Sequence, residues 1–156
     1  MAFDFNSYLS PFTWRYGSDE MRFLWSEVHK RSLWREVWAA LAQAESDYGL
    51  VTPEQVQHLR ARVREIDVER ALEIEAQIHH DLMAELKAYA ELAPDAKRIL
   101  HLGATSADIE DNADVLRTRE ALDLTLERLS ALLLDCCARV VEFSDLPVIA
   151  DRERLA

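Results

Sequence analysis

The sequence predicts an all-α protein, and three observations lead to that prediction. Apolar residues recur every three or four positions along most of the chain, which is the spacing of a helix face. Residues that cap helix ends stand where these patterns begin and stop, at Ser18, Gly49, Thr52 and Asp67. No segment alternates apolar and polar residues as a strand does, and no internal repeat is visible. By length alone, 156 residues favour a single domain.

The composition argues against several classes of function. The chain has 18 Lys and Arg against 29 Asp and Glu, and the net charge of −11 suits neither nucleic acid nor an anionic membrane surface. The sequence contains no apolar run of transmembrane length and no signal-peptide pattern. Cys136 and Cys137 are adjacent, so we expect two small buried residues in a reducing cytoplasm, with neither a disulfide nor a metal.

The first 17 residues have no clear period and are expected to form an ordered arm. Within it, Arg15 and Tyr16 form a pair that can grip a phosphate or carboxylate and cover a ring. A salt bridge beside a packed aromatic explains the same pair without any ligand.

A long helix is predicted from residue 19 to about Tyr48. Ser18 is placed to cap its start, and Gly49 is placed to end it as a left-handed C-cap. The polar run at 29–32 breaks the apolar spacing, so we expect a solvated or partner-facing turn there. A short helix follows, because Thr52, Pro53 and Gln55 match the cap, first-turn proline and capping-box positions. Its apolar face is predicted to hold Val56, Leu59 and Val63.

Asp67 is predicted to cap a helix that runs to about Ala93 and stops before Pro94. Its predicted buried stripe holds Leu72, Ala76, Met83 and Leu86. His79 falls on that stripe, and His80 and Asp81 follow it, so a buried histidine and a ligand-binding group are both open. A metal site is not expected, because helical ligand pairs need a spacing of three or four residues.

The segment His101–Asp108 (HLGATSAD) links two helical patterns. Gly103 suits a sharp connection, Thr105 is a candidate N-cap, and Asp108 can return a bond to the cap's own N–H. Free N–H groups and hydroxyls at a helix N-terminus can bind an anion, and His101 stands just upstream. A helix cap beside a structural histidine accounts for the same residues.

A helix of nearly forty residues is predicted from Ser106 to about Phe143. Its apolar residues alternate steps of four and three, as in the seam of a coiled coil: Leu122, Leu126, Leu129, Leu133, Cys136 and Val140. Leu132 and Leu134 widen the seam, which implies more than one partner helix.

These residues carry a resemblance to a known family. The segment His101–Asp108 resembles the first signature region of the fumarase/aspartase superfamily and, within it, that of the adenylosuccinate lyase family. The arm from Arg15 to Met21 (RYGSDEM) and the segment ending in His80-Asp81 resemble two further motifs of that family. The likeness covers about residues 12–149. It divides the chain into an N-terminal helical domain with part of the active site (1–111), the start of a central helical bundle (112–149) and a charged tail (150–156).

The resemblance implies elimination of fumarate from adenylosuccinate or from the related succinyl-carboxamide ribotide, in purine biosynthesis and without a cofactor. It assigns Arg15 and Tyr16 to the nucleotide, His101 to the region of its phosphate, and Thr105 and Ser106 to the succinyl portion. It makes His80 a substrate-binding group that assists proton transfer, with Asp81 beside it. It implies a homo-oligomer, tetrameric in the full-length family, with no nucleic-acid or membrane partner.

The chain departs from the family pattern at two places. His79 stands where the family usually has Arg before His-Asp, which weakens one charge contact to the substrate. After Ile149 the sequence does not continue into the second and third signature regions, so we expect this chain to be inactive alone. Another lyase or a cycloisomerase of the superfamily, or a non-catalytic helical oligomerisation module, remain alternative interpretations.

Overall fold

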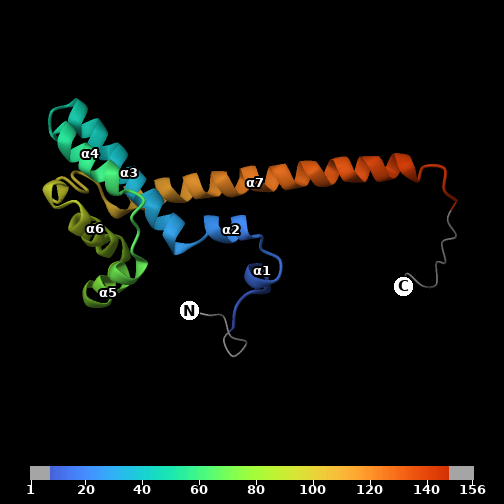
Figure 1. The fold of residues 1–156 in the computed structure, drawn as a ribbon, viewed down its shortest axis with the longest axis horizontal. Coiled ribbons are helices and arrows are strands. Elements are labelled where there is room, and N and C mark those ends of the chain that lie inside the picture. Colours follow the sequence, from blue (N-terminus) through green and yellow to red (C-terminus); the bar gives the residue numbers. More distant parts are fainter. Residues whose placement is uncertain (1–7, 148–156) are drawn as a thin grey trace. The chain divides into compact units, whose positions relative to one another are not determined.

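The computed structural model describes residues 8–147 and confirms the all-α prediction, since those residues form helices and no strand. Its elements are α1 (Pro11–Trp14), α2 (Asp19–Leu24), α3 (Glu27–Asp47), α4 (Pro53–Arg62), α5 (Val68–Ile78), α6 (Asp81–Leu92), the 3₁₀ turn η1 (Pro94–Ala96) and α7 (Ser106–Glu142) (Figure 1). Two compact units divide the chain, the first ending at Ala121 and the second beginning at Leu122. The predicted tail at 150–156 lies outside the described residues.

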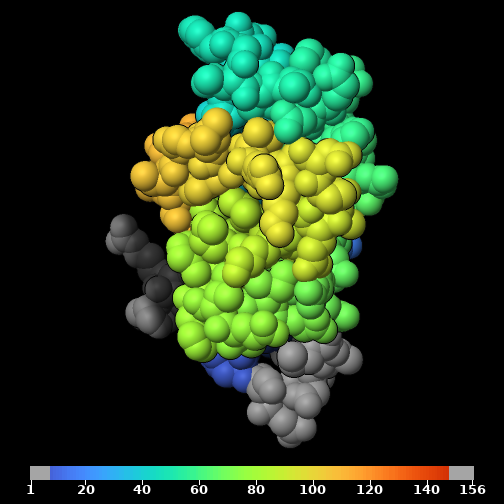
Figure 2. Space-filling view, turned by 90° about the vertical axis from the view of Figure 1, so that its left-hand side faces the viewer, coloured from blue at the N-terminus to red at the C-terminus, as the bar shows by residue number. Residues whose placement is uncertain are grey.

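The core of the first unit is built from α3, α4, α6 and the start of α7. Its large buried side chains include Trp38, Leu59, Tyr89 and Ile109. The phenol of Tyr89 donates a hydrogen bond of 2.7 Å to the carbonyl of Leu59, so the one polar atom of this ring is satisfied in the core. The segment from η1 to α7, yellow to orange in Figure 2, crosses one face between the end of the α3–α4 pair and the α5–α6 pair.

Several helix ends follow the local sequence signals. Ser18 caps α2, Asp67 caps α5, and Thr52 forms a reciprocal capping box with Gln55. Gly49 has φ of 73°, and two backbone bonds, Gly49 N to Ser46 O and Leu50 N to Glu45 O, complete a Schellman motif. The buried face of α4 holds Val56, Leu59 and Val63, as predicted, and α7 ends within one residue of its predicted end.

The prediction of a solvated or partner-facing turn at 29–32 is wrong, because these residues lie inside α3. The helix instead breaks three residues earlier, where Trp25 ends α2 and the Ser26 side chain accepts a bond from the His29 N–H to start α3. His29, Arg31 and Ser32 are all buried inside α3. A polar run at this position therefore marks buried charge and hydrogen bonding, with partners that lie far away in sequence.

The prediction of one helix from Asp67 to Ala93 is also wrong, because the chain breaks at two histidines. His79 ends α5 in the left-handed conformation (φ 55°, ψ 38°), and His80 is the N-cap of α6. The break changes the phase of the helix, so Ala71 and Ile74 are buried while Leu72 and Ala76 are exposed. His79 is exposed, which excludes the expected buried histidine on that stripe.

The second unit contains the C-terminal part of α7. Residues 122–147 are all exposed except Leu124, which is half-buried. Five of the predicted seam residues expose more than half of their surface: Leu122, Leu126, Leu129, Leu133 and Val140. Cys136 and Cys137 are exposed and unpaired with each other, so their predicted burial is wrong. No helix among residues 8–147 has the length and apolar character needed to cross a membrane.

Candidate functional site

The start of α7 is shaped by a compact loop. His101 and Gly103 both have positive φ, 65° and 66°, and Thr105 immediately precedes the helix. The predicted return bond is present: the Thr105 N–H donates to Asp108 Oδ2 at 2.8 Å. The Thr105 hydroxyl donates to the same oxygen at 3.1 Å, whereas the predicted N-cap role would have it accept from a backbone N–H.

These two bonds hold the pKa of the Asp108 carboxyl below its ordinary value, with the backbone N–H of Thr105 the larger cause. Because the folded-state pKa is the lower one, the stabilisation of the fold by the Asp108 carboxylate is present above the ordinary pKa of about 3.9 and is lost as pH falls through the folded-state pKa.

We expect Asp108→Asn to remove this acid-dependent loss of stability. Unfolding by urea between about pH 5 and pH 2 measures it, and parallel pH profiles for wild type and variant would contradict the expectation.

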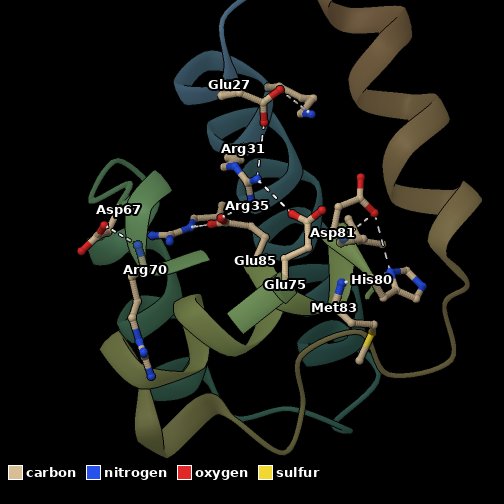
Figure 3. A network of polar contacts seen from close by, with 12 residues as sticks. Glu27, Arg31, Arg35, Asp67, Arg70, Glu75, His80, Asp81, Met83 and Glu85 are labelled. Carbon is tan, nitrogen blue, oxygen red and sulfur yellow. Dashed lines mark hydrogen bonds and ion pairs between the residues drawn. The ribbon is translucent and has the colours of Figure 1, made fainter. Parts of the chain in front are cut away.

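The α5–α6 junction places His80 next to the start of α7. His80 Nδ1 lies 3.5 Å from the N–H of Met83, which it caps, and 3.7 Å from Asp81 Oδ1 (Figure 3). On the other side of the ring, His80 Nε2 lies 3.5 Å from the Ser106 hydroxyl. Two segments separated by 26 positions therefore meet at one place, with an imidazole and a hydroxyl in contact.

Glu110 belongs to the same cluster, although the sequence analysis did not include it. Burial raises the pKa of its carboxyl, the nearby carboxylate of Asp81 raises it further, and His80 acts in the opposite direction. Glu110 follows Ser106 by four residues, so the two side chains share one face of α7. This spacing of four residues in the sequence could have predicted that Glu110 lies beside Ser106.

His101 is held from the protein interior. The indole Nε1 of the buried Trp38 donates to His101 Nδ1 at 3.1 Å. Burial lowers the pKa of the His101 ring; the Asp108 carboxylate opposes this effect, and His80 adds to it. The ring is therefore biased toward its neutral form. The contact of Trp38 with His101 spans 63 positions, so no local sequence pattern indicates it.

Arg15 and Tyr16 lie on the arm around α1. The Arg15 guanidinium stacks over the Trp14 ring at 4.5 Å, and the exposed Tyr16 ring lies 6.3 Å from that of Phe12. The described contacts of these two residues are thus with α1, whereas His80, Asp81, Thr105 and Ser106 gather at the start of α7. His79 precedes this cluster with its backbone in the left-handed region.

A buried ion network lies behind the His80 junction, and sequence reasoning missed it. Glu85 of α6 binds both Arg35 (2.6 Å) and Arg31 (3.1 Å) of α3, and all three side chains are buried (Figure 3). Arg31 also lies 3.9 Å from Glu75 of α5. The network therefore ties α3 to both helices that flank His79 and His80.

The arrangement offers hydrogen-bond donors, an imidazole and a carboxyl group around one helix N-terminus. The hydroxyls of Thr105 and Ser106 stand where the helix dipole favours an anion. The His80 imidazole and the Glu110 carboxyl are groups that exchange protons. Within residues 8–147, no three His, Cys, Asp or Glu side chains come together in a way that could hold a metal ion.

A comparison with protein-family models gives no match. The chain is 37% identical over 150 residues to adenylosuccinate lyase of Saccharomyces cerevisiae, covering 94% of this chain and 31% of that protein. It is 41% identical over 124 residues to adenylosuccinate lyase of Pyrococcus horikoshii, covering 78% of this chain and 28% of that protein. The chain thus spans about a third of the length of these relatives.

Among solved structures, the fold is similar to that of a fumarate lyase from Mesorhizobium sp. BNC1. The TM-score is 0.65 at 29% sequence identity, over 72% of this chain and 27% of that one.

Proposed function

We propose a function from the premise that this chain belongs to the adenylosuccinate lyase family, within the fumarase/aspartase superfamily. It contributes the N-terminal part of a site that eliminates fumarate from adenylosuccinate or from the related succinyl-carboxamide ribotide. The observation that carries the proposal is the contact of 3.5 Å between His80 Nε2 and the Ser106 hydroxyl, because it unites the two motif segments in one site.

Each group has a role in such an elimination. A base must remove a proton beside a carboxylate, an acid must protonate the departing nitrogen, and donors must hold the developing negative charge. At the start of α7, the Ser106 hydroxyl supplies a donor for a carboxylate of the succinyl portion, and the Thr105 hydroxyl supplies a second donor when that carboxylate replaces Asp108 as its acceptor. His80 assists proton transfer, supported by Asp81 and Glu110, and His101 donates toward the nucleotide phosphate. Arg15 and Tyr16 of the arm contact the nucleotide.

The proposal includes assembly through the second unit. Its exposed leucines form the apolar face that a helical bundle buries, and each Leu side chain buried there contributes about 1.5–3 kcal/mol. A homo-oligomer, tetrameric in the full-length protein, and a cytoplasmic location are parts of this proposal. The exposed leucines also support the second candidate, a non-catalytic helical oligomerisation module.

A chimera separates the two candidates. Residues 8–147 replace the matching N-terminal part of the Saccharomyces cerevisiae relative, and fumarate release from adenylosuccinate is followed by absorbance. We expect an assembled, active chimera in which His80→Ala lowers kcat about 10²- to 10⁴-fold, the usual range for a group that transfers a proton.

The matched control is His58→Ala, because His58 is an exposed histidine that pairs with Asp95 away from the cluster. This control should leave kcat unchanged. An assembled chimera that releases no fumarate, or whose activity survives His80→Ala, would contradict the lyase proposal and favour the oligomerisation module.

A further inference from the structure

Trp38 connects the core to the candidate site through one polar bond. The residue lies in the middle of α3, and only 1% of its surface is exposed. Its indole Nε1 lies 3.1 Å from His101 Nδ1, and the two rings meet edge to face at 83° with centroids 6.1 Å apart. An indole N–H can only donate a hydrogen bond, so the imidazole atom facing it must accept.

The direction of this bond determines where His101 carries its proton. A neutral imidazole has one N–H and one bare nitrogen, and the partner of one nitrogen fixes the state of the other. With Nδ1 accepting from Trp38, the proton resides on Nε2. Protonation of Nδ1 would place two N–H groups against each other and would break the bond.

Burial and two charged groups from other elements determine the direction of the pKa shift of His101. Burial is the main cause that lowers the pKa of the ring. The Asp108 carboxylate of α7 opposes this effect, and His80 at the start of α6 adds to it. The neutral ring therefore prevails at pH 7, in agreement with the direction of the hydrogen bond.

The strained backbone of His101 indicates that surrounding contacts hold this residue in place. Its φ of 65° is in the left-handed region, which is strained for a residue with a Cβ. Such a conformation persists only where surrounding contacts impose it. The bond from Trp38 is a contact that the His101 side chain makes with the rigid core.

We propose that Trp38 is a positioning residue that fixes His101 as a neutral Nε2–H donor directed to the anion bound at the start of α7. This inference rests on the proposed function for the identity of that anion, a nucleotide phosphate. It assigns His101 a donor role and removes it as a proton acceptor, because its bare nitrogen is engaged by Trp38. Proton transfer is left to His80 and its neighbours.

The tautomer can be read directly from the full chain without any ligand. Histidine is labelled with ¹⁵N, and two-bond couplings from the ring carbon protons distinguish protonated from bare nitrogens. The His101 signals are assigned as those lost in His101→Asn. We expect a bare Nδ1 and a protonated Nε2 from pH 7 to 8. Protonated Nδ1 in the wild type would overturn the proposal, whatever any variant does.

Trp38→Phe tests the cause, because it keeps an aromatic ring and removes only the donor. We expect the His101 signals to move toward a mixture of the two tautomers, and the titration midpoint of the ring to rise. An unchanged tautomer in a folded Trp38→Phe chain would overturn the role of Trp38.

The matched control is Trp34→Phe on the same helix. Trp34 is also buried, and its Nε1 has no hydrogen-bond partner among the described residues. The Trp34→Phe variant should keep the wild-type tautomer of His101. An equal change in Trp34→Phe and Trp38→Phe would show a packing effect and overturn the proposal. Because no substrate is used, an inactive chimera would refute the lyase proposal and leave this result standing.

Discussion

Glu85→Ala is expected to cost about 3–5 kcal/mol of the free energy of unfolding, the usual cost of breaking a buried ion pair by removing one partner. Both oxygens of Glu85 are engaged, one by Arg35 Nε at 2.6 Å and the other by Arg31 Nη1 at 3.1 Å. Alanine would leave two buried guanidinium groups without the carboxylate between them. Arg35 would keep its bonds to the carbonyls of Arg62 and Glu65, which cannot neutralise its charge.

Urea unfolding followed by circular dichroism measures this cost. Glu36→Ala is the matched control, because Glu36 pairs with the exposed Arg64, and exposed pairs contribute about 0–1 kcal/mol. Glu85→Gln keeps the shape without the charge and should fall between the two. A loss for Glu85→Ala no larger than that of the control would show that the network does not hold α3 against α6.

Leu129→Glu combined with Leu133→Glu is expected to convert a self-associating chain into a monomer. Soluble monomers rarely expose large contiguous apolar patches, and the second unit exposes Leu122, Leu126, Leu129 and Leu133 on one helix face. We therefore expect the wild-type chain to associate through residues 122–141. Two glutamates in that seam place like charges opposite each other and remove two apolar contacts.

Light scattering at tens of micromolar protein decides the question. Ala131→Glu with Ala138→Glu adds the same charge on the opposite side of the helix, since these positions lie about 180–200° from Leu129 at 100° per residue. This control should keep the wild-type mass. A wild-type chain with the mass of a monomer would contradict the association model.

Helix ends were predictable where the responsible contacts are local. Thr52 and Gln55 stand three residues apart, and so do Thr105 and Asp108, so each pair is visible in the sequence. The buried charges were not predictable in this way. Arg35 and Glu85 are 50 positions apart, and an arginine inside a polar run looks the same whether it faces water or a buried carboxylate.

The candidate site also combines local contacts, which the sequence predicts, with contacts between distant segments, which it does not. The Thr105–Asp108 bonds at the start of α7 follow from the local sequence, whereas the contacts of His80 with Ser106 and of Trp38 with His101 depend on tertiary packing. The break at His79 was missed because it lacks the glycine or proline that normally marks a helix end. A left-handed residue with a side chain is stabilised by its surroundings, and those lie outside any local window.

The left-handed backbones of His79 and His101 also have an evolutionary consequence. At each position glycine would relieve the backbone, yet it would delete the imidazole side chain. Backbone conformation and side-chain chemistry therefore favour different amino acids at these two positions. A lineage that no longer used the site could therefore accept glycine at either position without a backbone penalty.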